Sequence, residues 1–199
     1  MTHLSKVGAA LFLAVMTSAC DPVTAVVGGA ATIGVGAAEE RGLEGAVDDT
    51  KIRTSINDLW IRQDFDLFRN VSLTVSEGRV MLTGSVKKPE NRVDAVRLAW
   101  QAPGVRQVID EIQVEDQSGF ADYTGDVWIA NKLRTRLMFD GQIKNINYTV
   151  DVVNGVVYLM GIAQNQGELD RVIAHARDTS GVKRVVSHVV LKNDPKRQS

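Results

Sequence analysis

The chain has 199 residues, and its 23 lysines and arginines against 24 aspartates and glutamates give a formal net charge of −1. General nucleic-acid binding needs an excess of positive charge, so this balance argues against a nucleic-acid partner. Hydrophobic residues make up 44% of the sequence, which is typical of a globular protein. A single cysteine excludes a disulfide within the chain.

Residues 1–19 have the features of a secretory signal peptide. Lys6 precedes an apolar run from Val7 to Met16, which is too short to cross a bilayer because a spanning helix takes about 20 residues. Small residues then lead into Cys20, an arrangement that resembles the lipobox of bacterial lipoproteins. The resemblance implies that the mature chain begins at Cys20 and carries three acyl chains there, enough for firm anchoring. The alternative is an ordinary signal peptide in which the cysteine occurs by chance.

An uncharged Gly-, Ala- and Val-rich segment follows from Val23 to Ala38. Its glycine content makes it a poor transmembrane helix, so residues 20–45 are expected to form a tether that lies close to the lipid surface.

The first folded element is predicted by helical spacing. Ile52, Ile56 and Leu59 fall at i, i+4 and i+7, with Asp48 or Asp49 as N-cap. Trp60 at the end of this helix is expected in a core or an interface, and we expect the same of Trp100.

A β-hairpin comes next, because alternating apolar residues flank a turn at Glu77-Gly78. A second helix is predicted over 89–101 and a last strand over 108–114. The predicted order is α-β-β-α-β, with two helices packed on one face of a three-stranded mixed sheet.

Residues 71–114 recur as residues 148–191 at a constant offset of 77 positions. The shared glycines are Gly78 and Gly155, Gly84 and Gly161, and Gly104 and Gly181. The second copy predicts a helix from Ile129, Leu133 and Leu137 with Asp126 as N-cap, a hairpin at Asn154-Gly155, a helix over 166–179 and a strand over 185–191. The fold class is therefore α+β, with two tandem αββαβ units.

Both copies resemble the BON domain. The resemblance rests on a G-x-V-x-L-x-G strand, at 78–84 and 155–161, and on a P-G-V or S-G-V turn into the last strand, at 103–105 and 180–182. It predicts BON domains over 46–116 and 126–192, with a linker at 117–125 and a basic tail at 193–199. Lys192, Lys196 and Arg197 are expected to belong to a solvated chain end.

The resemblance implies a periplasmic module that binds phospholipid. On family grounds the lipid anchor is expected in the outer membrane. The inner membrane stays open, because Asp21 after the cysteine resembles a retention signal.

The two copies differ in charge. Residues 48–116 hold ten basic and twelve acidic residues, whereas residues 126–197 hold eleven basic and seven acidic, a net of +4. In the second copy Trp128, Lys132 and Arg136 recur at i, i+4 and i+8 beside the core residue Ile129. Tryptophan suits a bilayer interface and basic residues suit anionic headgroups, so these four residues are the predicted phospholipid site. The alternative is that Trp128 packs between the domains while the basic residues are solvated.

The positions in the first copy that correspond to the stripe are Val47, Lys51 and Ser55, which lack the aromatic anchor. No nucleophile, phosphate-loop or zinc-protease motif occurs, and the two remaining histidines, His175 and His188, lack metal-ligand spacing. We therefore expect no catalytic residue, cofactor or metal. The rival function is a protein-interaction adaptor that docks on an envelope assembly and uses lipid only as an anchor; Trp128 buried against the first copy would favour it.

Overall fold

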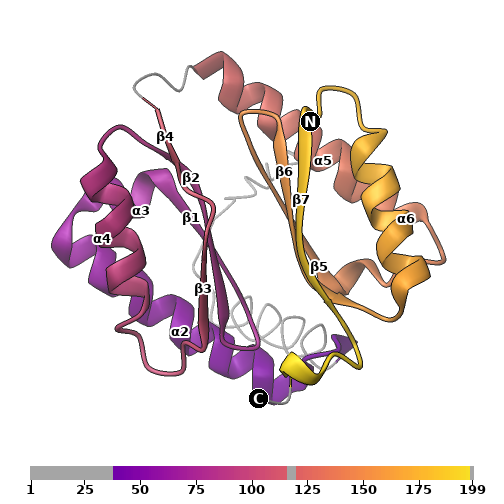
Figure 1. Cartoon of the computed structure of the whole chain (residues 1–199), viewed down its shortest axis with the longest axis horizontal. Coiled ribbons are helices and arrows are strands. Elements are labelled where there is room, and N and C mark those ends of the chain that lie inside the picture. The colour runs from indigo at the N-terminus through magenta and orange to yellow at the C-terminus, as the bar shows by residue number, and fades with distance from the viewer. Residues whose placement is uncertain (1–37, 116–119, 198–199) are drawn as a thin grey trace, which may run out of the picture.

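The computed structural model describes residues 38–115 and 120–197. The expected leader, Cys20 and most of the expected tether lie outside these residues. Two α+β units stand side by side, with their sheets facing each other and their helices on the two outer sides (Figure 1). The molecule therefore has four layers, in the order helix, sheet, sheet, helix.

The first unit is built around a central strand, β2, which pairs antiparallel with β1 and parallel with β3 and β4. The bounds are α2 (Gly42–Gln63), α3 (Phe65–Asn70), β1 (Val71–Ser76), β2 (Arg79–Val86), α4 (Pro89–Ala99), β3 (Gln107–Asp110) and β4 (Gln113–Val114). Apolar residues of α2 and α4 pack on the face of this sheet that points away from the second unit, and Trp60 lies fully buried among them. The expectation is wrong for Trp100, which caps the C-terminal end of α4 and has an exposed side chain.

The second unit repeats this plan around β6, which pairs antiparallel with β5 and parallel with β7. The bounds are α5 (Phe120–Phe139), the 3-10 turn η1 (Asn145–Asn147), β5 (Tyr148–Val153), β6 (Val156–Ala163), α6 (Gln166–Arg177), β7 (Arg184–Leu191) and the 3-10 turn η2 (Pro195–Arg197). Arg79 pairs with Gln107 and Val156 with Arg184, so the 77-residue offset holds in the sheet register as well. The α+β class and the αββαβ order are confirmed, while the first unit adds the short helix α3.

The last strand of the first unit is split, where the sequence predicted one strand over 108–114. The Asp110 carboxylate accepts a hydrogen bond from the Ile112 amide at 3.1 Å, and Ile112 is buried in the core. This local bond takes a backbone donor that a continuous strand would have used for the sheet. The parallel pairing to β2 resumes beyond it as β4.

The predicted N-cap role of Asp49 and Asp126 is wrong. Both residues lie inside their helices, since α2 begins at Gly42 and α5 at Phe120. Each carboxylate instead accepts both backbone N–H groups of its hairpin turn: Asp49 those of Glu77 and Gly78, both at 2.9 Å, and Asp126 those of the turn at Asn154 and Gly155, at 2.6 and 2.7 Å. All four turn residues have positive φ, as a type I′ turn requires.

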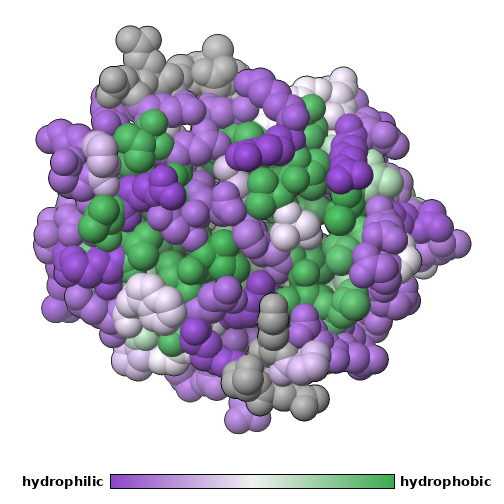
Figure 2. All heavy atoms as spheres, in the orientation of Figure 1, coloured by the Kyte–Doolittle hydropathy of each residue, from purple (hydrophilic) through white to green (hydrophobic). Residues whose placement is uncertain are grey.

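The two sheets meet through the faces that their helices leave uncovered. Met81 and Ile109 of the first unit form a buried cluster with Tyr158 and Met160 of the second. Hydrophobic residues gather over the middle of one face of the molecule, and hydrophilic residues surround them (Figure 2). At the margin of the interface, His188 Nε2 lies 2.8 Å from a Glu111 carboxylate oxygen, and Arg79 donates to the His188 carbonyl at 2.8 Å. The two units therefore form one packed body.

Each end of the described chain binds the other unit. Glu40, just before α2, accepts hydrogen bonds from Lys144 at 2.8 Å and pairs with Lys192 at 3.1 Å, both in the second unit. Arg197, beyond β7, donates to Glu77 in the hairpin turn of the first unit at 2.6 and 2.8 Å. The prediction of a solvated chain end is therefore wrong for Lys192 and Arg197, because each pairs with a carboxylate of the first unit. We call these contacts, from Glu40 to Lys144 and Lys192 and from Arg197 to Glu77, the terminal clamp.

The clamp predicts a pH dependence of stability. The hydrogen bond from Lys144 is the largest influence on Glu40 and lowers the pKa of its carboxyl from 4.5 to about 2. A lowered folded-state pKa contributes stability that is present above pH 4.5 and is lost as pH falls toward 2. Glu40→Gln should therefore cost about 1 kcal/mol of unfolding free energy at pH 7, and the difference from wild type should shrink below pH 4.5.

Urea unfolding at several pH values measures this difference. Glu44→Gln is the matched control, because Glu44 is an exposed carboxylate on the first turn of α2. A Glu40 effect that is equal at pH 3 and pH 7 would contradict the assignment.

Candidate functional site

Helix α5 has one apolar side that holds it to the second unit. Ile129, Leu133 and Leu137 are all buried in the core of that unit, together with residues of β6 and α6. Their spacing of four residues brings them to one face of the helix, and this face fixes the direction of the opposite one. Ile129 was predicted as part of the binding site, but its side chain is 5% exposed and packs close to Gly181, so it supports the helix from the inside.

The outer side of α5 carries the rest of the predicted site. Trp128 is 54% exposed, and the Lys132 ammonium lies 4.5 Å from the centroid of its ring, a cation–π contact. Arg136, one turn further along, donates to the Asp178 carbonyl at 3.0 Å and to the Thr179 hydroxyl at 3.4 Å. The structure therefore brings Trp128, Lys132 and Arg136 together, with Arg136 held against the loop after α6.

Phe139 is a surface aromatic that the sequence analysis missed. It ends α5 and is 79% exposed, the most exposed of the large hydrophobic side chains described. It lies eleven residues, or three helical turns, after Trp128, so the two positions share one side of the helix and are about 16 Å apart along its axis. The same spacing could have identified it in the sequence. We call Trp128, Lys132, Arg136 and Phe139 the α5 stripe.

A shallow open depression lies beside the far end of the α5 stripe. It has a volume of about 840 Å³ and is lined by Arg136, Phe139, Asp140 and His175, among others. A hydrogen bond from His175, at 2.8 Å, lowers the pKa of Asp140. Arg171 also approaches this carboxylate at 3.7 Å, so the Asp140 carboxylate beside Phe139 and Arg136 is paired with basic side chains.

The first unit lacks such a stripe at the corresponding positions. Val47 is exposed there, and Lys51 is paired with Asp48 at 2.8 Å. In the described ranges, no helix is both long and apolar enough to cross a membrane. Nor do three or more His, Cys, Asp or Glu side chains gather there in a way that could hold a metal ion.

Comparison with known proteins identifies the repeated unit. The BON domain model matches residues 48–116 and 125–193. An uncharacterised protein of Anaplasma centrale is 40% identical over 153 residues, which cover 76% of this chain and all of that protein. The outer membrane lipoprotein DolP of Haemophilus influenzae is 28% identical over 94% of this chain and 95% of its own.

The osmotically-inducible protein Y of Escherichia coli is 26% identical over 73% of this chain and 74% of its own length. The resemblance drawn from the glycine and valine motifs is confirmed in both copies. The chain therefore belongs to the family of BON-domain proteins, and it carries two such domains in tandem.

Proposed function

We propose that this protein is a lipid-anchored protein of the cell envelope that binds anionic phospholipid through the α5 stripe of its second BON domain. Residues 1–19 act as the leader, and Cys20 carries the lipid. The relative named as an outer membrane lipoprotein, which aligns over nearly the whole chain, supports an outer-membrane anchor facing the periplasm. The protein supports the integrity of that membrane by binding, without catalysis.

The observation that carries the proposal is the pair of exposed rings on α5. The side chains of Trp128 and Phe139 are largely exposed to water. The basic residues Lys132 and Arg136 lie between them. Entry of a ring into the bilayer interface removes apolar surface from water and leaves the indole N–H hydrated. Each basic side chain near an anionic surface adds about 1 kcal/mol.

The exposure of Trp128 also bears on the adaptor alternative. A Trp128 ring buried against the first domain would have favoured a structural role for the stripe. Instead the contact between the domains runs through the sheets, by way of Met81, Ile109, Tyr158 and Met160. The ring is therefore free to meet an external surface.

Vesicle flotation tests the proposal. The full chain carrying Cys20→Ser, and so no lipid, should float with vesicles that contain phosphatidylglycerol and not with phosphatidylcholine vesicles, and added salt should weaken the binding. Trp128→Ala should reduce the affinity about tenfold, because burial of a large side chain is worth about 1.5–3 kcal/mol. Phe139→Ala should act in the same direction.

Trp100→Ala is the matched control, since Trp100 is equally exposed but lies on α4 of the first domain, away from α5 (Figure 1). Equal losses of vesicle affinity for Trp100→Ala and Trp128→Ala would contradict the assignment of the binding site to α5. If the unlipidated chain binds neither kind of vesicle, lipid is an anchor alone and the adaptor function takes its place.

A further inference from the structure

A second cavity lies between the two domains, on another side of α5 from the stripe. It has a volume of about 500 Å³, within the range of small-molecule sites. Phe68, Ser72 and Ser85 line it from the first domain, and Tyr123, Val127 and Asp151 from the second. An occupant would therefore touch both BON domains at once.

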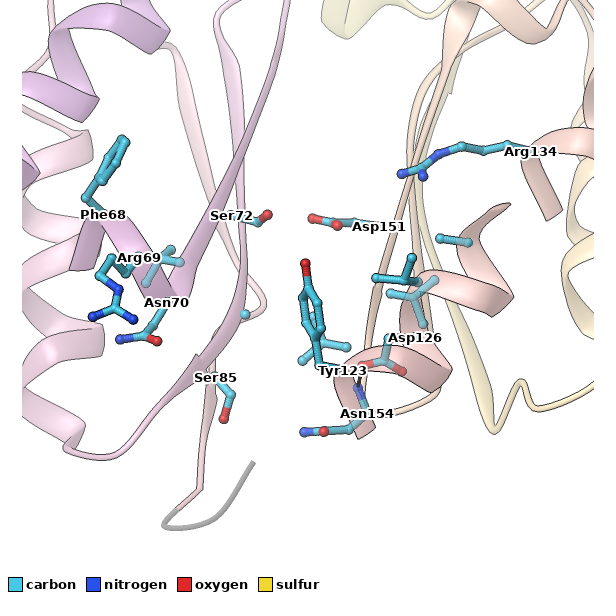
Figure 3. A pocket seen from close by; sticks show the side chains of 16 residues that line it. Phe68, Arg69, Asn70, Ser72, Ser85, Tyr123, Asp126, Arg134, Asp151 and Asn154 are labelled. Carbon is cyan, nitrogen blue, oxygen red and sulfur yellow. Dashed lines mark hydrogen bonds between the residues drawn. The ribbon is translucent and has the colours of Figure 1, made fainter. Parts of the chain in front are cut away.

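Three hydroxyls and one carboxylate oxygen of residues that line this cavity have no hydrogen-bond partner among the residues that the structure describes. The Ser85 hydroxyl oxygen is buried and makes no hydrogen bond. Ser72 and Tyr123 are exposed, and their hydroxyls bond to no other described residue, while Asp151 uses one carboxylate oxygen for the Thr83 hydroxyl, which leaves Oδ1 unused. Figure 3 shows Ser72, Tyr123 and Asp151 pointing toward one another across the gap. Polar groups that converge in this way are typical of a site that fixes the orientation of a bound ligand.

The second domain serves as an internal control for the fold. At the offset of 77, Ser85 corresponds to Ile162 and Thr83 to Met160, both buried apolar residues. The BON fold thus accepts apolar side chains at these strand positions. A buried hydroxyl without a partner costs about 1–3 kcal/mol, so Ser85 destabilises the fold, and a ligand would offset this cost once the Ser85 side chain turns its hydroxyl toward the cavity.

The charges around the cavity select the class of ligand. Arg69 and Arg134 line it together with Asp126 and Asp151, so a cation and an anion would each meet like charge. An acyl chain would leave the Asp151 oxygen and the hydroxyls desolvated and unpaired. A neutral ligand rich in hydroxyls can donate to Asp151 and can exchange hydrogen bonds with Ser72, Ser85 and Tyr123.

An aromatic ring at the cavity fits the same ligand. Tyr123 is exposed, and Figure 3 shows its ring standing in the gap between the two domains, whereas the Phe68 ring points away from the gap. A sugar ring has an apolar face of C–H groups that packs on a ring such as that of Tyr123, while its rim carries hydroxyls. We propose that the cleft between the two BON domains is a saccharide-binding site, with Ser85 and Asp151 as its hydrogen-bonding centre.

Calorimetric titration of the full chain carrying Cys20→Ser tests this site. The probes are chitotriose and maltotriose, with inorganic phosphate and dodecanoate as ligands of the rejected classes. We expect one of the two saccharides to bind with a dissociation constant of about 1 mM or better. Because the ligand bridges both domains, saturation should also raise the melting temperature.

Two variants separate binding from folding. Ser85→Ala should weaken the saccharide about tenfold while keeping or raising the melting temperature of the free protein, since it removes an unpaired hydroxyl. Asp151→Asn should also weaken binding, whereas Trp128→Ala on the α5 stripe should leave it unchanged. The proposal is overturned if neither saccharide binds at about 10 mM, if dodecanoate or phosphate binds in their place, or if Ser85→Ala binds like the wild type. None of these results depends on vesicle binding.

Discussion

Replacement of Gly161 by alanine should destabilise the second BON domain by about 3 kcal/mol or more, among the largest effects expected of a single methyl group. Gly161 lies in β6 opposite Tyr148, with a φ of 148° that side chains rarely adopt. A Cβ atom there would lie 2.0 Å from the Asn147 carbonyl oxygen and 3.0 Å from the Tyr148 Cα. Both are backbone atoms, so relief requires that β5 and η1 move away from β6.

Gly84 in the first domain allows a second test of the same effect, and Gly141 in the loop after α5 is the control position. Gly84 stands at the equivalent position, where a Cβ atom would lie 2.2 Å from the Asn70 carbonyl oxygen. Gly141 has nothing within 4 Å of its Cβ position, and Gly141→Ala should change stability by less than about 0.5 kcal/mol. Urea unfolding followed by tryptophan fluorescence gives the three values, and a Gly161→Ala loss no larger than that of Gly141→Ala would contradict the packing described.

These glycines also show why the fold of each unit was predictable. Local signals set the hairpins, since Asn154-Gly155 favours a type I′ turn and the flanking residues alternate. Helical spacing likewise identified Ile52, Ile56 and the matched residues of α5 as core. The duplication then supported each assignment twice, because the same pattern recurs at a fixed offset.

Long-range contacts were not predictable in the same way. The sequence marks Asp49 as a polar residue at the start of an apolar pattern, which suits an N-cap as well as it suits a turn 28 residues away. Arg197 is one of several basic residues near the chain end, and nothing local reveals Glu77 as its partner. The first pairing depends on how α2 packs against the hairpin of its own domain and the second on how the two domains pack, and a local pattern encodes neither.

Only part of the candidate site could be predicted from the sequence, for a similar reason. Periodicity brought Trp128, Lys132 and Arg136 to one face of α5, and the same rule applied to the end of the helix would have added Phe139. Ile129 was predicted both as a core residue and as part of the site; it is buried, because adjacent residues on a helix lie about 100° apart and this one faces the core while Trp128 faces outward. The cleft between the domains combines residues of α3, β1, β2, α5 and β5, so no single segment of the sequence predicts it.

The contact between the sheets leads to the second large effect. Met160 on β6 is fully buried with Met81, Ile109 and Tyr158, and it belongs to this interface cluster and not to the core of its own domain. Met160→Lys would bury an ammonium among apolar side chains, which costs several kcal/mol unless the group reaches water. We expect the domains to separate, because separation exposes the lysine and leaves the core between β6 and the helices intact.

Small-angle X-ray scattering and circular dichroism distinguish this result from unfolding. The radius of gyration should rise while the helix and strand signal stays near that of the wild type, and saccharide binding in the cleft should be lost. Met138→Lys is the matched control, since Met138 is a largely exposed methionine of the same domain and its replacement should leave the radius unchanged. Vesicle binding should survive in Met160→Lys, because the α5 stripe lies on the second domain alone. An unchanged radius at unchanged stability would mean that the buried cluster does not hold the two BON domains together.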